Sequence, residues 1–580
     1  MRSLVLVILV ILVGAISNGS FAQGNAPTWQ WGQCHGSILK QEYPGAMASD
    51  TKSNLITLEN YLDSNEAIER IHTIKCTKYS PSGEIIWRRL IGRPDKQLEN
   101  NFLLIGSSIC IDSFDNIYFT IGTGPNLLID STVYSSAEIQ GNMILCKLSP
   151  EGTLLWRDIL ATYAPFTTIL GIDKKNILYC AGTLPQNGYL HINGISYLDT
   201  SNSDRFFIAK FGQDGKPLWV KNEDTASRTI EHQHQIGSVA TGLTFDSKNN
   251  LLVCGYFRDT MIIDGIKKVS LADSWDVFYA SFFADGSLKS LNQAWGYLNE
   301  YADAIAVDEQ DNILLSCRTS GDIFFFDRQH SDTSISGYGK ANLLIQFDSD
   351  FVIGWSHRIK NVFNDWLSTV GISYDPVNHQ FVSLIHSIDT TTLDNIPLPV
   401  PYVDCLVAMK SDGITRWISP TLVQSHSQLL EFVVNRQGDY YAGGMLGDAA
   451  AQSENITYDS VVFISVVGKM FFYTHGGADC FIGKLSTASS NVQHQAQHTA
   501  LSSAYPNPFA DRTTLSLPAP ATEPLSLQLY NSLGVRVLQQ HYPAGANSIT
   551  LSRTGLAAGV YHYNISLASG AISKGEVIVQ

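Results

Sequence analysis

A ten-residue stretch that recurs along the chain limits the possible folds more than any other feature. At residues 147–156 it reads KLSPEGTLLW, and variants of it stand at 78–87, 210–219, 346–355 and 409–417. Pro fixes φ and Gly or Asp tolerates a positive φ, so Ser-Pro-x-Gly and its relatives are turn sequences. Strand-forming residues flank the turn on both sides, and each copy therefore predicts a β-hairpin.

A second predicted hairpin precedes each copy of this stretch. Its turns are short, rich in Asp and Asn, and placed between two apolar runs, at residues 112–116, 173–176, 246–250, 308–312 and 375–378. The residue that ends the repeat recurs every 62–71 positions, and it is Trp in every unit but the fourth: Trp87, Trp156, Trp219, Ser290, Trp355 and Trp417. Two hairpins per unit at a fixed period predict the four-stranded blades of a β-propeller.

The repeat predicts seven blades. They cover residues 45–92, 105–160, 167–222, 238–296, 301–360, 367–420 and 428–486. Blade seven lacks a Trp strand of its own, whereas the segment TWQWGQCHG near the start has no partner strands nearby. We therefore predict that residues 28–34 pair antiparallel with the strand at 479–485 and close the ring.

The recurring Trp is expected to be a wedge between neighbouring blades, since a large aromatic at a repeated position suits core packing. Carbohydrate stacking is the alternative role. Ser290 breaks the pattern, so blade four should pack its wedge differently.

The connections between the second and third strands of the blades are long. Their shared pieces, such as LLID, HING and IIDG, predict a small extra strand or turn, and loops of this length on one face are a candidate binding surface. The longest, residues 443–478, contains VVFISVVGKMFF, which is compatible with an elaborated face or with a wider blade.

The start of the chain reads as a secretory signal peptide over residues 1–22. Arg2 is followed by the apolar run LVLVILVILV, and small residues at Ser20 and Ala22 suit a cut before Gln23. This run is too short for a spanning helix, which needs ~20 residues, and no other apolar run is long enough. We expect an exported mature chain without a transmembrane helix. The net charge of −15 for the full chain argues against nucleic acid as a partner.

The nine cysteines do not predict a disulfide framework. Their number is odd, most stand inside strand patterns, and several occupy equivalent positions one blade apart, which is usually too far for a bridge. We expect few or no disulfides. No Cys-x-x-Cys occurs, so a zinc or redox site has no support.

The C-terminal part differs from the rest. Residues 487–503 read as a polar linker, and residues 504–580 alternate apolar and polar positions between short turns, which predicts a small immunoglobulin-like β-sandwich. The predicted fold is thus all-β, with a seven-bladed β-propeller over residues 23–486 followed by this sandwich.

The C-terminal part resembles a known family on a set of spaced residues. They are Tyr505, Pro506, Asn507, Pro508 and Phe509, then Gly534 within LYNSLG, Gly559 and Tyr561 within LAAGVY, and Lys574 within the closing KGEVIVQ. In order and spacing these motifs resemble the type A C-terminal sorting domain of proteins exported by the type IX secretion system.

The resemblance implies a folded signal that engages the type IX secretion machinery, crosses the outer membrane and is usually cleaved there. It implies a protein that is secreted or attached to the cell surface, at the outer membrane, of a Gram-negative bacterium. The rest of the chain resembles bacterial secreted β-propeller repeat proteins, which offer no shared chemistry to transfer.

No catalytic, metal or cofactor residue can be assigned from the sequence. His232 and His234 could place two imidazoles on one strand face but lack further ligands. Asp308, Asp311 and Asn312 offer oxygens for calcium, yet equivalent turns repeat the same residues, which indicates turn chemistry. We expect no cofactor, with calcium as the alternative.

The favoured function is an exported binding module for a glycan, a peptide or a matrix component. Whether the protein is an enzyme is not decided by the sequence. One alternative is a secreted polysaccharide-degrading lyase or hydrolase with a site at the propeller axis, and the other is a structural component of the cell surface.

Overall fold

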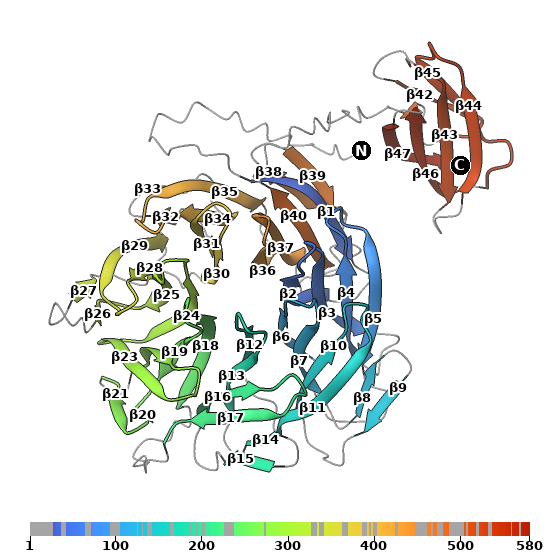
Figure 1. The fold of residues 1–580 in the computed structure, drawn as a ribbon. Helices are drawn as coiled ribbons and strands as arrows, with labels where there is room; N and C mark the ends of the chain where they lie inside the picture. The colour runs from blue at the N-terminus through green and yellow to red at the C-terminus, as the bar shows by residue number, and fades with distance from the viewer. Residues whose placement is uncertain are drawn as a thin grey trace, which may run out of the picture. The chain divides into compact units, whose positions relative to one another are not determined.

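A computed structural model shows the fold (Figure 1). The residues it describes are 27–35, 42–63, 71–92, 105–123, 126–129, 132–135, 142–162, 167–184, 188–192, 195–199, 204–224, 237–271, 274–325, 333–335, 341–361, 369–385, 391–393, 396–397, 403–423, 427–446, 461–465, 468–472, 479–486, 504–505, 509–517, 521, 523–531, 536–557, 559–567 and 570–579. In these ranges the regular structure is all β, as the sequence predicts, and no helix there could span a membrane.

Seven antiparallel sheets, each built on four blade strands, form the blades of a propeller, which confirms the predicted fold. Blade one consists of β2 (Glu42–Ser49), β3 (Leu55–Asp63), β4 (Ile71–Tyr79) and β5 (Ile85–Gly92). Blade two consists of β6 (Ile105–Ile111), β7 (Ile117–Thr123), β10 (Asn142–Leu148) and β11 (Leu154–Thr162). Blade three consists of β12 (Thr167–Ile172), β13 (Leu178–Leu184), β16 (Arg205–Phe211) and β17 (Pro217–Asn222).

Blades four to seven follow the same plan. Blade four consists of β18 (Ser238–Phe245), β19 (Leu251–Phe257), β22 (Asp276–Phe282) and β23 (Leu288–Gly296), and blade five of β24 (Glu300–Val307), β25 (Ile313–Thr319), β28 (Ala341–Phe347) and β29 (Ile353–Asn361). Blade six consists of β30 (Thr369–Asp375), β31 (Gln380–Ile385), β34 (Val403–Met409) and β35 (Thr415–Val423). Blade seven consists of β36 (Ser427–Val434), β37 (Asp439–Leu446), β40 (Asp479–Ser486) and β1 (Thr28–His35).

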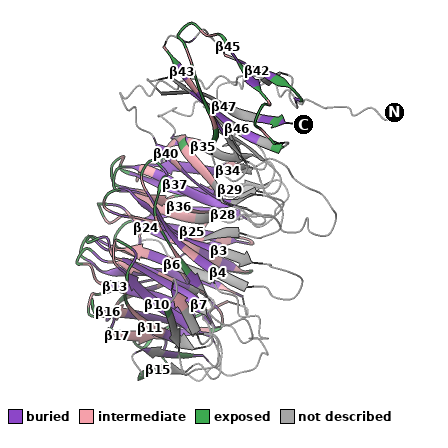
Figure 2. Cartoon of the chain, turned by 90° about the vertical axis from the view of Figure 1, so that its right-hand side faces the viewer, coloured by how far each residue is buried: buried purple, intermediate pink, exposed green. Residues whose placement is uncertain are grey.

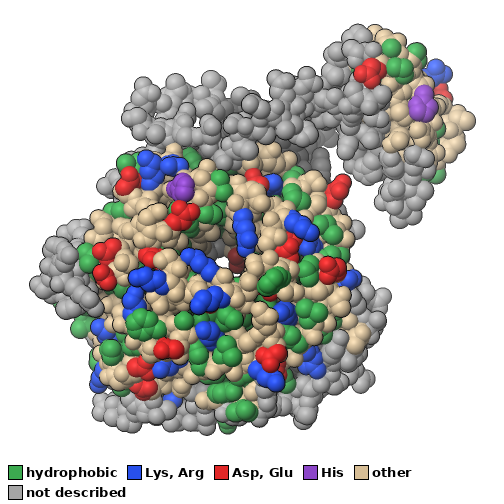
Figure 3. Space-filling view, in the orientation of Figure 1, with side chains coloured by type: hydrophobic (Ala, Val, Ile, Leu, Met, Phe, Trp, Pro, Cys, Tyr) green, Lys and Arg blue, Asp and Glu red, His purple; other side chains and the backbone are tan. Residues whose placement is uncertain are grey.

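The innermost strands of the blades form a closed ring, and the space-filling view shows an opening, the central channel, in its middle (Figure 3). Each touches the next in the order β2, β6, β12, β18, β24, β30 and β36, and β36 touches β2 (Figure 1). The first-to-second and third-to-fourth strand turns emerge together, and we call this side the turn face. The other connections emerge on the opposite side, which we call the loop face.

The ring closes through the N-terminal strand. β1 pairs antiparallel with β40, with Trp29 opposite Leu485 and Gly32 opposite Gly483. The pairing predicted for residues 28–34 is therefore present. It joins segments some 450 residues apart and pairs the edge of β40 that would otherwise be open.

The long connections form the predicted extra hairpins. Four of them pair with the outer strand of the preceding blade: β8 (Asn126–Ile129) and β9 (Thr132–Ser135) on β5, β14 (Tyr189–Ile192) and β15 (Ile195–Asp199) on β11, β26 (Ile323–Phe325) and β27 (Thr333–Ile335) on β23, and β32 (Thr391–Leu393) and β33 (Ile396–Pro397) on β29. They thus cover sheet edges that would otherwise be open to another chain, and their expected role as a binding surface stays a prediction.

Two further hairpins form small sheets of their own. They are β20 (Thr260–Ile263) with β21 (Ile266–Val269), and β38 (Val461–Ser465) with β39 (Gly468–Phe472). The second belongs to the longest connection, in blade seven, and it does not widen the sheet of that blade.

The recurring Trp is a wedge between blades, as predicted. The Trp87 Nε1 atom of blade one donates to the Pro150 carbonyl of the blade-two turn at 3.0 Å, and a Cβ on Gly152 would lie 3.2 Å from the indole ring. Gly152 has a φ of +81°, so the turn needs glycine for its backbone as well as for this contact. The same contact joins Trp31 to Gly83, Trp156 to Gly215, Trp219 to Gly286 and Trp355 to Gly413.

At the boundary between blades four and five, the aromatic partner of this contact comes from the other blade. Ser290 stands in the Trp position, and the glycine position of the following turn holds Phe351, with a φ of +63°. Phe351 is buried, and its ring lies 5.1 Å from that of Tyr279 in blade four. The aromatic wedge of this boundary therefore comes from blade five.

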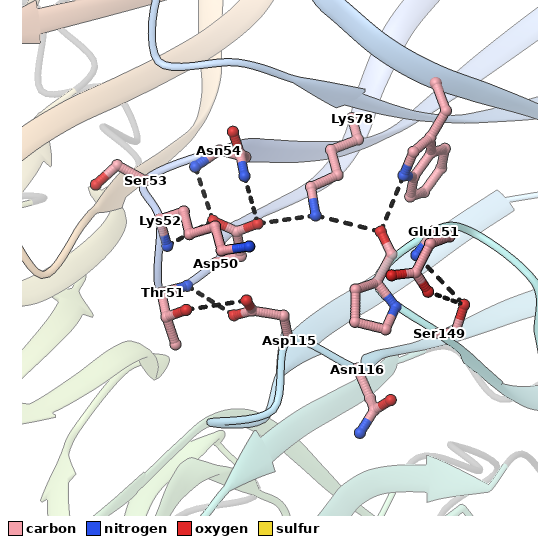
Figure 4. A network of polar contacts seen from close by, with 12 residues as sticks. Asp50, Thr51, Lys52, Ser53, Asn54, Lys78, Asp115, Asn116, Ser149 and Glu151 are labelled. Carbon is pink, nitrogen blue, oxygen red and sulfur yellow. Dashed lines mark hydrogen bonds and ion pairs between the residues drawn. The ribbon is translucent and has the colours of Figure 1, made fainter.

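The inner turns are joined to one another around the channel mouth. In blade one, Thr51 donates from its backbone N and its Oγ1 to Asp115 of blade two, at 2.8 and 2.9 Å (Figure 4). The blade-two turn bonds Asn176 of blade three in the same way, at 2.8 Å from Ser113 N. These acceptors sit at positive φ in their turns, a conformation that Asn and Asp tolerate.

The C-terminal unit has two sheets. One holds β41 (Ala504–Tyr505), β42 (Arg512–Ser516) and β45 (Ser548–Ser552), and the other holds β43 (Leu525–Asn531), β44 (Arg536–Tyr542), β46 (Gly559–Leu567) and β47 (Gly570–Val579). Apolar side chains from both sheets, such as Leu515, Leu527 and Ile565, form one buried core (Figure 2).

The chain divides into two compact units, Met1–Thr487 and Ala488–Gln580. The expected limits of the signal peptide (1–22), the propeller (23–486), the linker (487–503) and the sorting domain (504–580) stay predictions, as does the immunoglobulin-like character of the sandwich.

Candidate functional site

A cluster of aromatic and ionisable side chains lies on the loop face where blades four and five meet. The end of β19, the start of β22, the β23–β24 connection and the end of β25 all come together there because antiparallel strands place these ends on one side. We call this cluster the blade-four/five site.

Three aromatic rings from separate strands form its inner part. Tyr256 lies at the end of β19, Trp275 directly precedes β22, and Tyr301 is in β24. The centroids of Tyr256 and Trp275 are 5.1 Å apart, and those of Tyr256 and Tyr301 are 4.9 Å apart, both in edge-to-face arrangement. All three side chains are half-buried, so each still presents part of its surface to solvent.

A second aromatic group lies at its outer part. Trp295 in β23 stacks on Phe324 in β26 at 4.6 Å, and Tyr297 meets Phe324 edge-on at 6.2 Å. Tyr297 is 71% exposed and the adjacent Leu298 is 53% exposed. An exposed tyrosine and leucine beside a stacked pair give this edge an apolar surface that faces solvent.

Two fully buried carboxyl groups belong to the residues next to these rings in the sequence, Asp276 after Trp275 and Glu300 before Tyr301. Asp276 accepts hydrogen bonds from Gln293 Nε2 at 2.7 Å and from Leu271 N at 3.2 Å. Glu300 accepts from Thr319 Oγ1 at 3.4 Å, whereas its Oε2 has no hydrogen-bond partner among the described residues. A Cβ on Gly296 would lie 2.5 Å from Glu300 Oε1, so glycine at 296 makes room for this carboxyl group.

Burial controls the protonation of both groups. It raises the pKa of Asp276 to about 6. Burial, together with the neighbouring Asp276, raises the pKa of Glu300 to about 9. Glu300 is therefore a neutral carboxylic acid at pH 7, able to donate a hydrogen bond.

An ion pair borders the channel side of the site. Arg318 Nε donates to Asp303 Oδ1 at 2.8 Å, and its guanidinium lies 5.3 Å from the centre of the Tyr301 ring. Asp303 is the extra residue of a β-bulge in β24, which re-aims its side chain. Burial raises the pKa of Asp303 to about 7 despite the arginine.

Sequence reasoning did not single out any of these residues. The positions 256, 275 and 301 are far apart in the chain and belong to no motif. The one signal at this boundary is the broken repeat at Ser290, which marks blade four as unlike its neighbours.

The structure places the sorting-signal residues in the C-terminal unit. Phe509 and Tyr561 are buried in its core, and the Tyr561 hydroxyl donates to the Ala557 carbonyl at 2.9 Å. Tyr505 is in β41, Gly559 begins β46 at a φ of +153°, and Lys574 is in β47 opposite Asn564. Pro506, Asn507, Pro508 and Gly534 lie outside the described residues.

The residues that the sequence analysis considered as metal ligands lie in turns or outside the described residues. His232 and His234 lie outside the described residues. Asp308 accepts hydrogen bonds from Asn312 N at 2.8 Å and from Asn312 Nδ2 at 2.7 Å, while Asp311 accepts from Ser247 of blade four. These oxygens hold the turns together, and the described ranges contain no group of three or more His, Cys, Asp or Glu arranged to hold a metal.

Eight cysteines have described side chains, and all eight are free thiols: Cys76, Cys110, Cys146, Cys180, Cys254, Cys317, Cys405 and Cys480. Burial raises the pKa of Cys146 and of Cys254 to about 12, so these thiols stay protonated and unreactive at neutral pH.

Residues 503–580 match the family of secretion system C-terminal sorting domains. No curated protein matches the chain. The solved structure of xylan beta-1,4-xylosidase from Bacillus Halodurans C-125 aligns with 79% of this chain and 98% of its own, at 8% identity and a TM-score of 0.27.

A likeness that low carries no conclusion about substrate or activity, and the fold of the main part is established by its own strand pairing. The sorting-domain match covers the segment in which the sequence motifs lie. The protein is thus a secreted or surface-attached β-propeller protein that carries the C-terminal sorting domain of the type IX secretion system.

Proposed function

We propose that the propeller is an exported binding module and that it holds an extracellular glycan at the blade-four/five site. The observation that carries this proposal is the solvent-facing aromatic surface around Tyr297 and Phe324 on the loop face. Sugar rings have apolar faces that stack on aromatic side chains, and Tyr and Trp add polar tips for hydroxyl groups.

The neighbouring polar groups suit the same class of ligand. The partly exposed Arg318 guanidinium supplies donors beside Tyr301, and the largely buried Asp303 holds it in place. Glycan hydroxyls both donate and accept, so a guanidinium beside tyrosine hydroxyls can fix the orientation of a sugar that the aromatic rings hold by stacking.

Binding to a glycan array by the purified protein tests the proposal. Tyr297→Ala is expected to weaken binding to the glycans that the parent retains by about tenfold, as the loss of one stacking ring on a shallow surface implies. Phe283→Ala is the matched control, because Phe283 is also exposed, at 45%, but lies in the outer turn of blade four on the turn face. Equal losses in both variants, or no retained glycan, would contradict the assignment.

The route to the cell exterior follows from the sorting domain. We propose that residues 1–22 direct export across the inner membrane and that residues 504–580 carry the propeller across the outer membrane, to remain there or to be released. A chain that ends at residue 490 should accumulate in the periplasm. Normal surface display of that shorter chain would contradict this role.

A secreted polysaccharide-degrading enzyme is the second candidate. The observation in its favour is the group of buried carboxyl groups with raised pKa values at Asp276, Glu300 and Asp303, since such groups are frequent at catalytic sites. Release of reducing ends or unsaturated sugars from the bound glycan would support it. Such activity should disappear in Asp303→Asn while glycan binding persists, whereas a binding module shows no release in either form.

A further inference from the structure

The turn face has a charge pattern that the blade-four/five site does not explain. Exposed Lys and Arg side chains lie on the inner turns of blades one, three, four and seven: Lys52, Lys174, Lys175, Lys248 and Arg436. Figure 3 shows Lys and Arg side chains gathered around the central hole on this face. We call these five residues the cationic mouth.

The carboxyl groups on the same turns are directed into the turns and not to solvent. Asp50 accepts from Asn54 and forms an ion pair with Lys78 at 2.9 Å (Figure 4). Asp246 accepts from Lys248 N at 2.9 Å and from Asn250 N at 2.8 Å. Because backbone N–H groups and a buried lysine neutralise these carboxylates, a ligand at the surface meets mainly the cations.

Among the described residues of the inner turns, one carboxylate is highly exposed. It belongs to Glu309, and its Oε2 lies 3.1 Å from His379 Nδ1 of blade six. The outer turns have the opposite character, with exposed acidic side chains at Glu84, Glu151, Asp214, Asp285, Asp348, Asp350 and Asp412. The turn face therefore has a cationic centre within an acidic border, in a chain whose net charge is −15.

Hydrogen bonds within and between the inner turns hold the backbone that carries the cationic mouth. The backbone N of Lys174 donates to Asn249 of the next blade at 3.3 Å, and the backbone N of Lys175 donates to Asp173 Oδ1 at 2.8 Å. The backbone N–H groups of Lys174 and Lys175 hold the turns in place, whereas their side chains carry the positive charge. The charges thus stay near the hole, yet each ammonium group can move to meet a ligand.

We propose that the cationic mouth binds an acidic polysaccharide, a single chain that bears carboxylate or sulfate groups. Ammonium groups arranged around one opening can pair with several anionic groups along such a chain. The exposed Phe114, on the inner turn of blade two, offers an apolar surface to a sugar ring between the charges.

The acidic border selects against wider polyanions. A nucleic acid duplex laid across the mouth would bring its phosphates against the outer turns, where Glu151 and Asp214 are exposed. Like charges at that distance repel, so the usable area is limited to the mouth and to a narrow chain. An acidic peptide is narrow as well, but it lacks the sugar face that Phe114 would contact.

The test compares binding of the purified protein to polygalacturonate, neutral dextran and polyglutamate. A variant with Lys174→Glu, Lys175→Glu and Lys248→Glu should lose at least tenfold in affinity for polygalacturonate. The matched control changes Lys216→Glu and Lys289→Glu, two exposed lysines of blades three and four outside the inner turns, and should stay within about twofold of the parent. Parent affinity should also fall steeply between 50 and 300 mM salt, as exposed ion pairs require.

Each remaining outcome bears directly on the proposal. Binding of polyglutamate as tight as that of polygalacturonate would overturn the polysaccharide assignment and favour an acidic protein partner. Equal losses in the test and control variants would overturn the location at the mouth. Tyr297→Ala lies on the other face and should leave polygalacturonate binding unchanged, so failure of this proposal and failure of the proposed function can be told apart.

Discussion

The exchanged wedge between blades four and five gives a prediction that depends on two residues at once. At five other boundaries an indole packs on a glycine of the next blade, whereas here Ser290 stands in the indole position and Phe351 in the glycine position. We expect Ser290→Trp and Phe351→Gly to be destabilising alone and to compensate each other when combined, because together they restore the pair that the other blades use.

The magnitudes follow from the contacts. Phe351 is 8% exposed, so truncating it removes a core aromatic at about 3–5 kcal/mol, while glycine relieves about 1 kcal/mol at its φ of +63°. Ser290→Trp alone inserts an indole where Phe351 already packs, at about 1–3 kcal/mol. If the effects were independent, the double variant would lose about 3–7 kcal/mol. Compensation should recover at least 2 kcal/mol of that loss.

A double-mutant cycle measures this coupling. Urea unfolding followed by far-UV circular dichroism avoids the signal that an added tryptophan brings to fluorescence. Ser290→Ala serves as the control and should stay within about 0.5 kcal/mol of the parent, because a half-buried serine at this position fills little space. Additive losses in the double variant would show that the two positions do not share one packing site and would refute the exchange.

Three further predictions concern closure, protonation and thiols. Deleting residues 27–35 should lower the melting temperature by more than a normal terminal truncation and produce oligomers in gel filtration, because β40 becomes an open edge; an unchanged monomer would contradict ring closure. The pKa of Glu300 is about 9 in the folded state, which is above its unfolded value, so protonation of Glu300 adds stability that is full below pH ~4.5 and is lost as the pH rises through 9. Glu300→Gln should flatten this loss in the free energy of unfolding measured against pH. The control Glu151→Gln should not. Alkylation of the native protein with iodoacetamide should leave the eight described cysteines unmodified until urea is added, and rapid native labelling of several would show that they are accessible.

The sequence predicted the propeller because its signals are local. The turn at Ser149–Gly152 and the strand patterns beside it fix one hairpin, and repetition then fixes the blade. The closure by residues 28–34 could also be predicted, because Trp31 stands in the repeated position and blade seven lacks that strand.

The partners of the extra hairpins could not be predicted. Strands such as β8 and β14 hold four residues each, and they pair through backbone groups that every sequence has. Which edge they cover depends on the shape of the assembled ring and not on their side chains. The same segments looked like a binding surface because length and polarity alone do not show where a hairpin docks.

The blade-four/five site was hidden for a different reason. A glutamate at the start of a strand usually reads as a solvated residue, and nothing in WGYLNEYAD shows that Glu300 is fully buried. Its burial results from Gly296, Trp275 and Thr319, which come from three different parts of blades four and five. Only the assembled ring brings them together.

The departures from the repeat meet at this one boundary. Ser290 and Phe351 exchange the wedge there, and Asp276 and Glu300 bury carboxyl groups whose raised pKa values lower stability at high pH. The other boundaries show that the repeat can be packed with a Trp–Gly wedge. A boundary that instead keeps destabilising buried acids beside exposed aromatics indicates selection for something other than stability. For this reason we expect the glycan of the proposed function to bind at the blade-four/five site and not at the regular channel wall.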